Sequence, residues 1–468
     1  MKKINQLLDC DYNINISGIT CDSRLVKDNY LFIATKGYNV DHFDYINDAI
    51  KNGAVCIIAD RKIDIKSDVF LIVVDDIIST YEKICYRFYD IDISLFNFIG
   101  ITGTDGKTTT SSIIKQIINN SSKIAYIGTN GMEVSNVKYS VNNTTPCLEE
   151  LCYLLSIIKK YNCKDIVMEV SSEALLYGRV DSILYSYVGF TNITEDHLNI
   201  HKNIDNYINS KKHILDLLSD NGYLIVNGDD EICRNLTYSN IFKYGFNSDN
   251  DYVISSVKYE NSCVKFDINY NNDVFHINGN ISGKYNVYNI TLAFIISYLY
   301  GIDSNDIISS LKNLNVINGR REFLNYGQDY NIVLDYAHTY NGIKELISSF
   351  SNYKNIIVVT GAAGGREKCK RGLIGKYLLN NTSFVIFTMD DPRYEKPLDI
   401  INDLIGECTF TNYKIIIDRY FAIKYALDMA KKNDLVLIIG KGRDNYMAIL
   451  DKKIKYCDYD VINRYFNC

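Results

Sequence analysis

The stretch that decides the fold runs from Gly100 to Thr110 and reads G-I-T-G-T-D-G-K-T-T-T. An apolar run over 95–99 predicts a strand before it, and an amphipathic pattern predicts a helix that begins near Thr108. Strand, glycine-rich turn, lysine and helix in this order are typical of a loop that binds nucleotide phosphates. The spacing is the narrower G-T-x-G-K-T-T variant, because Ile101 stands where the common motif has its first glycine. We therefore expect an ATP site here rather than a chance glycine-rich turn.

The residue types in this loop suit a triphosphate. Gly103 and Gly106 allow positive φ angles, which bring backbone N–H groups close to a bound anion. Lys107 supplies a positive charge for the β and γ phosphates, and the hydroxyl of Thr108 is suited to Mg²⁺. The helix adds the positive end of its dipole. The predicted ATP-binding residues of the loop are Gly103, Thr104, Asp105, Gly106, Lys107, Thr108 and Thr109.

The composition is that of an ordinary globular protein. The chain has 468 residues, of which 47% are apolar and 23% charged, so we expect several domains. A net charge of −6 argues against nucleic acid as the main partner. No apolar run is long enough for a membrane span, and the start lacks a signal-peptide pattern, so we expect a cytoplasmic protein without membrane insertion. We also expect a monomer. The 13 cysteines include no C-x-x-C pair, which argues against a zinc site or a disulfide framework.

Alternating strand and helix patterns predict three α/β domains. Residues 1–96 contain short strands and one or two helices, which is typical of a small α/β domain. Residues 97–325 contain the phosphate loop and apolar runs without alternation, which favour a buried parallel sheet. In residues 326–468 several strands end in turns rich in Gly or Asp, which predicts a Rossmann-like α/β domain with a second ligand-binding face.

Polar residues follow several predicted strands of the central domain. Glu169 lies at the end of one apolar run that predicts a strand, and His197 follows the next predicted strand. Ligands of open α/β sheets collect at the carboxyl ends of strands, so both residues are candidates for metal binding beside the phosphate loop, although a single Glu or His is more often structural. Asn286 and Asn289 share one face of a predicted helix, where paired amides could read a purine edge or could cap the helix.

Together these motifs resemble the Mur ligases, the ATP-dependent amide-bond-forming enzymes of peptidoglycan precursor synthesis. Within them the chain is most similar to the MurE type, which adds the third residue of the stem peptide. The resemblance covers essentially the whole chain. Besides the phosphate loop it rests on D-S-R at 22–24, N-T-T-P at 143–146, M-E-V-S-S at 168–172, G-R-V at 178–180, Y-N-V-Y-N at 285–289, G-R at 319–320, D-Y-A-H-T at 335–339, D-P-R at 391–393 and G-K-G at 440–442.

The resemblance implies a reaction and its substrates. ATP would phosphorylate the terminal carboxylate of UDP-MurNAc-L-Ala-D-Glu, and the amine of a diamino acid would displace phosphate from the resulting acyl phosphate. Two Mg²⁺ ions are implied. The implied catalytic residues are Lys107, Glu169, His197, Lys211 and Arg320, and the implied metal ligands are Thr108, Glu169, His197 and Lys211 modified to a carbamate.

The resemblance also assigns binding roles. Arg320 would reach the γ phosphate, while Ser23 would contact uridine. The other residues implied to bind ATP are Asn286, Asn289, Asp335 and Tyr336, and those implied to bind the sugar-peptide are Thr144, Thr145, Ser171 and Arg179. The residues implied to bind the incoming amino acid are Arg366, Asp390, Asp391, Arg393, Gly440 and Asp444.

Some positions depart from the family's pattern. The phosphate loop has Asp105 where MurE enzymes usually have Asn, and Glu173 replaces a common His. The motif D-D-P-R replaces D-N-P-R around Asp391, and Arg443-Asp444 replaces the usual His-Glu. The last two departures fall on the groups that select the third residue.

The choice of amino acid depends on Arg393. Its guanidinium suits the second carboxylate of meso-diaminopimelate, whereas L-lysine ends in an ammonium. Asp391 and the short Asp444 add acid that could pair with Arg393 and favour L-lysine. Because a bidentate arginine–carboxylate contact usually outweighs one neighbouring acid, we predict meso-diaminopimelate, with L-lysine or another diamino acid as the alternative.

Other functions are weighed against this one. Another Mur-type ligase stays possible, while folylpolyglutamate synthetases usually read G-K-G-S in the loop and lack D-x-P-R. The joint presence of Lys107, Glu169, His197 and Lys211 argues against a non-catalytic nucleotide-binding protein. A simple phosphate-loop kinase or motor would leave residues 326–468 unexplained.

Overall fold

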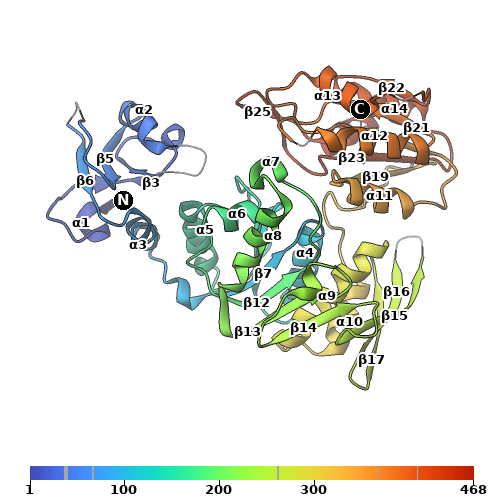
Figure 1. Ribbon diagram of the computed structural model, residues 1–468, viewed down its shortest axis with the longest axis horizontal. Coiled ribbons are helices and arrows are strands. Elements are labelled where there is room, and N and C mark those ends of the chain that lie inside the picture. Colours follow the sequence, from blue (N-terminus) through green and yellow to red (C-terminus); the bar gives the residue numbers. More distant parts are fainter. Residues whose placement is uncertain (36–40, 66–67, 261–262, 367, 408, 468) are drawn as a thin grey trace. The chain divides into compact units, whose positions relative to one another are not determined.

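The computed structural model describes residues 1–35, 41–65, 68–260, 263–366, 368–407 and 409–467. They form two compact units. Unit 1 comprises Met1–Gly100, Ser122–Val188 and His213–Gly222, and unit 2 comprises Ile101–Ser121, Gly189–Lys212 and Tyr223–Cys468. Figure 1 labels the helices and strands of both units. No helix among the described residues is long and apolar enough to cross a membrane.

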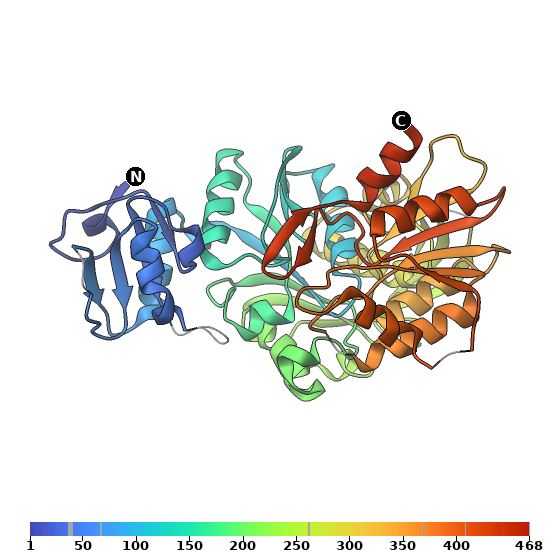
Figure 2. The same ribbon diagram turned by 90° about the horizontal axis from the view of Figure 1, so that it is seen from above.

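The N-terminal part of unit 1 is a small parallel sheet with helices beside it, drawn in blue in Figure 2. Its strand order is β3 (Gly18–Thr20), β4 (Tyr30–Ala34), β5 (Ala54–Ala59) and β6 (Phe70–Val73), all parallel. Accompanying elements are β1 (Lys2–Lys3), α1 (Ile4–Leu7), β2 (Asn15–Ile16), α2 (Ile46–Lys51) and α3 (Ile77–Tyr89). The apolar run at 31–34 forms the buried part of β4, and Phe32 and Ile57 belong to the core, so the small α/β pattern is confirmed.

One eleven-stranded sheet carries the phosphate loop. Its order is β10 (Val137–Tyr139), β9 (Gly131–Val134), β8 (Ile124–Gly128), β11 (Asp165–Glu169), β7 (Asn97–Thr102), β12 (Tyr185–Phe190), β13 (Leu218–Asn227), β14 (Ile241–Gly245), β15 (Tyr252–Tyr259), β16 (Val264–Tyr270) and β17 (Asp273–Gly279). Its helices are α4 (Lys107–Asn119), α5 (Leu148–Lys160), α6 (Ser172–Leu176), α7 (Leu198–His201), α8 (Ile204–Lys212), α9 (Lys284–Tyr300) and α10 (Ser304–Lys312).

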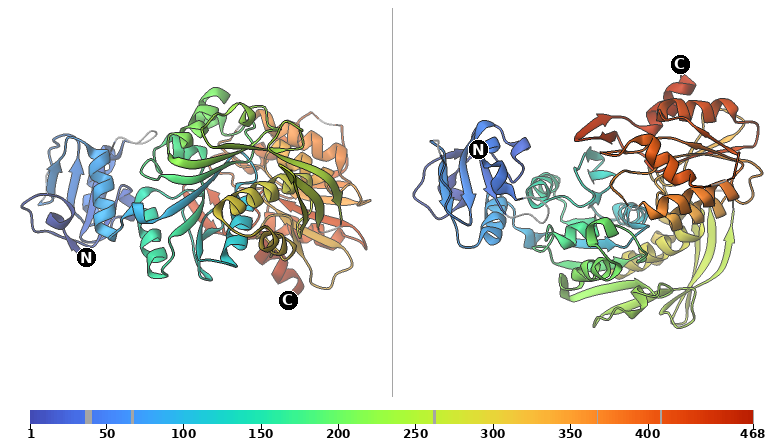
Figure 3. Two further views of the ribbon diagram at one scale, coloured as in Figure 1. Left: turned by 90° about the horizontal axis from the view of Figure 1, so that it is seen from below. Right: turned by 45° about the horizontal axis from the view of Figure 1, so that its top comes forward.

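The predicted parallel sheet forms the middle of this array, with β8 parallel to β11 and β13 parallel to β14. Both edges end in antiparallel strands, which the apolar runs do not predict. At one edge β9 and β10 are antiparallel, and at the other β15, β16 and β17 form the long yellow-green ribbons of Figure 3. Two-residue connections explain both, since 129–130 and 271–272 are too short for anything but a hairpin.

The C-terminal part of unit 2 is a six-stranded sheet between two helical layers. Its order is β18 (Glu322–Leu324), β19 (Asn331–Asp335), β23 (Leu435–Ile439), β20 (Ile356–Thr360), β21 (Phe384–Phe387) and β22 (Tyr413–Ile415), parallel except for β18. Its helices are α11 (Tyr340–Ser348), α12 (Cys369–Asn381), α13 (Pro397–Ile405), α14 (Arg419–Met429) and α15 (Asp458–Asn467), and β24 (Tyr446–Ile449) pairs with β25 (Lys452–Lys455).

Burial on both faces explains why these strands read as continuous apolar runs. Along β23, Leu435 and Leu437 point into a core shared with α11, α12 and α13, while Val436 and Ile438 point into a core shared with α14 and α15. The predicted open α/β architecture is therefore confirmed. It leaves the carboxyl ends of β19, β20, β21 and β23 as the places where polar side chains gather.

Candidate functional site

The phosphate loop lies between a strand and a helix as predicted, but the strand runs over Asn97–Thr102 rather than 95–99, because Leu95 ends a 3-10 helix. β7 ends at Thr102 and α4 begins at Lys107. Gly103 and Gly106 have φ angles of 141° and 91°. A Cβ on Gly103 would lie 1.9 Å from the hydroxyl of Thr191, and a Cβ on Gly106 would lie 2.5 Å from an oxygen of Asn289. Both positions therefore require glycine for space as well as for conformation.

Two cationic side chains reach this loop. The ammonium of Lys107 donates to the carbonyls of Gly103 and Thr104, each at 2.8 Å. Nη2 of Arg320 donates to the hydroxyl of Thr108 at 3.0 Å, and its guanidinium stacks on the ring of Tyr336. Arg320, predicted for the γ phosphate, thus lies at the start of α4 beside the hydroxyl predicted for Mg²⁺.

The two asparagines of α9 lie on one face of the helix, as predicted. Both are buried, and Nδ2 of Asn289 donates to Oδ1 of Asn286 at 3.1 Å. Helix capping does not explain them, because α9 begins after Gly283 without a side-chain cap. One cavity is lined by the predicted ATP-binding residues Asp105, Gly106, Thr109, Asn286, Asn289, Arg320, Asp335 and Tyr336.

Lys211 is unusual because its ammonium group is buried. It is 1% exposed, and Nζ donates to the carbonyl of Gly103 at 2.7 Å. No carboxylate of the described residues forms an ion pair with it. Burial, followed by the nearby charge of Lys107, moves the pKa of Lys211 well below its ordinary value. Its neighbour Lys212 is exposed, as expected for a solvated charge.

His197 lies after β12, and Asp196 is beside it. Nε2 of His197 is 3.4 Å from Oδ2 of Asp196. Burial lowers the pKa of His197 to about 3, so the imidazole is neutral, which is the form that binds metals. Among the described residues, no three His, Cys, Asp or Glu side chains cluster as a preformed metal site. A metal here would also require donors of other kinds, such as a hydroxyl, a carbamate or phosphate oxygens.

Glu169 belongs to unit 1, at the end of β11, and is completely buried. Its carboxylate accepts a hydrogen bond from the hydroxyl of Tyr126. It also accepts from the backbone N–H of Thr129 at 3.0 Å and from the Thr129 hydroxyl at 3.1 Å. These donors fix the orientation of the Glu169 carboxylate within unit 1.

Four of the residues predicted to bind the sugar-peptide form one network in unit 1. The hydroxyl of Thr145 bonds to that of Ser171 at 3.2 Å and to the carbonyl of Glu169 at 2.9 Å. Nη1 of Arg179 donates to the Thr145 carbonyl at 3.4 Å, and the Thr144 hydroxyl lies 3.1 Å from that of Thr129.

Ser23 is not joined to this network by any hydrogen bond among the described residues. It begins a short 3-10 helix after β3, and its carbonyl accepts from Asn52 at 2.9 Å.

The six residues predicted to bind the amino acid line a single cavity of about 310 Å³, and they are Arg366, Asp390, Asp391, Arg393, Gly440 and Asp444. Asp390, Asp391 and Arg393 follow β21, and Gly440 and Asp444 follow β23. Arg393 and Gly440 have positive φ angles of 50° and 109°. A buried Nη1 of Arg366 has no hydrogen-bond partner among the described residues, which is a typical state for an anion-binding group. These six residues thus bring two arginine side chains and three carboxylates to one cavity.

Family models match three successive parts of the chain. They are described as the Mur ligase family catalytic domain at residues 15–93, the Mur ligase middle domain at 101–297, and the Mur ligase glutamate ligase domain at 319–442. A UDP-N-acetylmuramoyl-L-alanyl-D-glutamate–2,6-diaminopimelate ligase of Fusobacterium nucleatum is 34% identical, over 98% of this chain and 95% of that protein. The chain belongs to the Mur ligase family.

Other comparisons agree with this membership. A ligase of the same name from Caldanaerobacter subterraneus is 34% identical over 99% of this chain and 97% of its own length. A solved structure of a UDP-N-acetylmuramoyl-L-alanyl-D-glutamate–2,6-diaminopimelate ligase matches with a TM-score of 0.65 and 24% identity, over 100% of this chain and 99% of that one. At that identity the structure supports the Mur ligase fold alone.

In this Mur ligase Asp105, which stands where MurE enzymes usually have Asn, has a hydrogen-bond partner. Its carboxylate accepts from the Thr339 hydroxyl at 3.1 Å, and Thr339 in turn accepts from the Gly342 N–H at the start of α11. Asp105 does not cap α4, whose first turn has no side-chain cap. The hydrogen bond with Thr339 therefore holds the extra charge on the α11 side of the loop.

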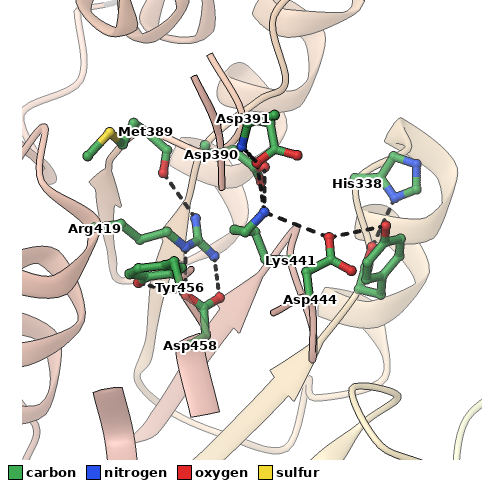
Figure 4. Close-up of polar contacts among 12 residues, drawn as sticks. His338, Met389, Asp390, Asp391, Arg419, Lys441, Asp444, Tyr456 and Asp458 are labelled. Carbon is green, nitrogen blue, oxygen red and sulfur yellow. Dashed lines mark hydrogen bonds and ion pairs between the residues drawn. The ribbon is translucent and has the colours of Figure 1, made fainter. Parts of the chain in front are cut away.

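Sequence reasoning missed Lys441 of this Mur ligase. The residue lies between two glycines of the G-K-G motif, and its ammonium lies among Asp390, Asp391 and Asp444 (Figure 4). The available signal was a lysine separated by one residue from the end of a buried strand, in the turn that also carries Asp444. Nothing in the sequence indicates that this lysine is only 1% exposed.

Proposed function

We propose that this Mur ligase joins an amine of 2,6-diaminopimelate to the terminal carboxylate of UDP-N-acetylmuramoyl-L-alanyl-D-glutamate. The observation that carries the proposal is the cavity that gathers Arg366 and Arg393 with Asp390, Asp391 and Asp444. A diaminopimelate has a second ammonium and a second carboxylate at its far end. Carboxylates and guanidinium groups in one cavity suit such a zwitterion, because each charge finds an opposite partner.

ATP is the proposed source of energy. The γ phosphoryl group would pass to the terminal carboxylate of the dipeptide, and the amine would then form the amide as phosphate leaves. Bringing two anions together requires local positive charge, which Lys107 and Arg320 supply at the phosphate loop. Asn286 and Asn289 would bind the adenine, with Asp335 and Tyr336 beside the adenosine.

Mg²⁺ is proposed as the metal, with Thr108, Glu169, His197 and a carbamate on Lys211 as its protein ligands. The donor types fit, since they are hydroxyl and carboxylate oxygens and a neutral imidazole. The buried Lys211 amine favours the neutral form that reacts with CO₂. When bound, Mg²⁺ would offset the negative charge of the phosphates.

We further propose that residues 1–96 bind the uridine end with Ser23, that residues 97–325 bind ATP, and that residues 326–468 bind the amino acid. The sugar-peptide would lie against Thr144, Thr145, Ser171 and Arg179, whose polar groups form one network. On this proposal the enzyme is a cytoplasmic monomer with no nucleic acid partner.

L-lysine is the second candidate for the amino acid. Asp390, Asp391 and Asp444 favour it, because its far end carries an ammonium without a carboxylate. Arg366 and Arg393 favour diaminopimelate, because it offers two carboxylates where L-lysine offers one.

The test measures phosphate release by the purified protein with ATP, UDP-MurNAc-L-Ala-D-Glu and either meso-diaminopimelate or L-lysine. Release should require all three substrates, and mass spectrometry should find the tripeptide product. We expect kcat/KM for meso-diaminopimelate to exceed that for L-lysine by at least about tenfold, because one buried charge pair is worth this much or more. A higher value for L-lysine would reverse the assignment.

A further inference from the structure

The ammonium of Lys441 is a buried positive charge next to three carboxylates that line the amino-acid cavity. The residue follows β23 in the turn that begins at Gly440, and it is 1% exposed. Nζ lies 2.8 Å from Oδ1 of Asp391, 3.8 Å from Asp390 and 3.7 Å from Asp444 (Figure 4). Although burial lowers the pKa of Lys441, the three acids raise it overall, so the ammonium is charged.

Among the three acids, only Asp391 makes a hydrogen bond to Lys441. The same oxygen, Oδ1, also accepts from the backbone N–H of Ala448 at 2.9 Å. Neither Lys441 nor Ala448 lines the cavity. Both hydrogen bonds to this oxygen therefore come from residues that do not line the cavity.

Arg393 is in the opposite situation. Its backbone N–H donates to the carbonyl of Ala448 at 3.0 Å, which fixes the position of the residue against β24. Its guanidinium lines the cavity and forms no hydrogen bond or ion pair with any of the described residues. Two acids lie two residues away in the chain: Asp391 is bound by Lys441, and Glu395 is bound by Arg371.

These contacts make the state of Arg393 depend on Lys441. Without the ammonium, Asp391 would be a partly buried carboxylate with one backbone donor, and desolvation would favour pairing with a cation in the same cavity. Arg393 is the cation closest in sequence. An Arg393 guanidinium bound to Asp391 would no longer be available to a substrate carboxylate.

We propose that Lys441 is a positioning residue for the amino-acid site, which binds Asp391 and thereby leaves Arg393 available for the second carboxylate of the substrate. This inference depends on the proposed function, and it adds the residue that maintains the preference for a dicarboxylic diamino acid. Lys441 touches no reacting atom in this assignment. Its effect on the reaction passes through Asp391.

The test is a double-mutant cycle with Lys441→Met and Asp391→Asn, measured as KM and kcat for meso-diaminopimelate and for L-lysine. Lys441→Met should raise KM for meso-diaminopimelate by about tenfold or more, with a smaller change for L-lysine, because a tenfold change corresponds to about 1.4 kcal/mol. The double variant should recover most of this loss, because the released carboxylate is gone. The matched control is Lys432→Met at an exposed lysine before β23, which should leave KM unchanged.

Losses that multiply in the double variant would overturn the proposal, as would equal losses for the two amino acids. If Lys441→Met does not fold, the double variant alone is used for the test. It removes the ammonium and the carboxylate together, so it leaves no unpaired buried charge from this pair. A folded double variant that keeps the preference for meso-diaminopimelate supports the proposal, and one that loses it refutes the proposal. A wild-type enzyme that uses neither amino acid would instead refute the proposed function.

Discussion

The guanidinium of Arg419 and the carboxylate of Asp458 form an ion pair with no solvent exposure, with Nη2 2.7 Å from Oδ2. Arg419 begins α14 and Asp458 begins α15. Arg419 also donates to the carbonyl of Ile439 at 2.9 Å and to that of Met389 at 3.5 Å (Figure 4). These carbonyls directly precede Gly440 and Asp390, so the buried pair supports both strand ends that carry the amino-acid cavity.

Replacing Arg419 by Met should destabilise the protein by about 3–5 kcal/mol, because Asp458 would become an unpaired buried charge. Urea denaturation of the full chain measures the change. Arg419→Met combined with Asp458→Asn should be less destabilising than the sum of the single changes, since the pair is lost together. A fall in the free energy of unfolding of less than about 1 kcal/mol for Arg419→Met would contradict the prediction, because so small a value is typical of exposed ion pairs.

Lys107→Ala should abolish ATP turnover, because it removes a charge that offsets the developing negative charge in a site with little water. The expected loss of kcat is about 100-fold or more, the size found when one donor to such charge is removed. Phosphate release with all three substrates measures it. Ordinary turnover in this variant would show that the loop after β7 does not hold the reacting phosphate.

Lys211→Ala should lose activity and regain part of it when short carboxylic acids are added, because a carboxylate can replace the proposed carbamate. The matched control is Lys212→Ala, which removes the exposed neighbouring lysine and should leave the rate unchanged. A ¹³C NMR carbamate signal from ¹³CO₂ in the wild type, absent in Lys211→Ala, gives a readout independent of activity. A fully active Lys211→Ala variant would contradict the carbamate.

The affinity for the diamino acid should fall as the pH is lowered through about 6. Burial raises the pKa of Asp444 to about 6, while Lys441 opposes the rise and Asp390 and Asp391 add to it. Arg320 also faces this carboxyl and lowers its pKa. Above the pKa the carboxylate is charged and attracts a substrate ammonium, and below it the attraction is lost.

The measurement for this prediction is KM for meso-diaminopimelate between pH 5 and 8, set against KM for ATP under the same conditions. Asp444→Asn should remove the pH dependence and have a KM close to the low-pH value of the wild type. A variant that keeps the wild-type profile would assign the titration to another group.

The sequence by itself determined the features that depend on neighbouring residues. The phosphate loop is local, because glycines with positive φ, a lysine and a helix start can be read from consecutive positions such as Gly103, Gly106 and Lys107. The polar strand ends were also predictable, since apolar runs fix where each strand stops. The six residues of the amino-acid cavity came from a family resemblance, and the structure places them around one cavity.

The tertiary structure alone decided which charges meet and which are buried. Lys441 and Asp391 are 50 residues apart, and Arg419 and Asp458 are 39 apart, so no local pattern indicates either pair. Burial also decides chemistry, because it lowers the pKa values of Lys211 and His197, and the sequence gives no measure of desolvation at these positions. Ionic state depends on the surroundings that folding provides, whereas the backbone of a tight loop depends mainly on its own residues.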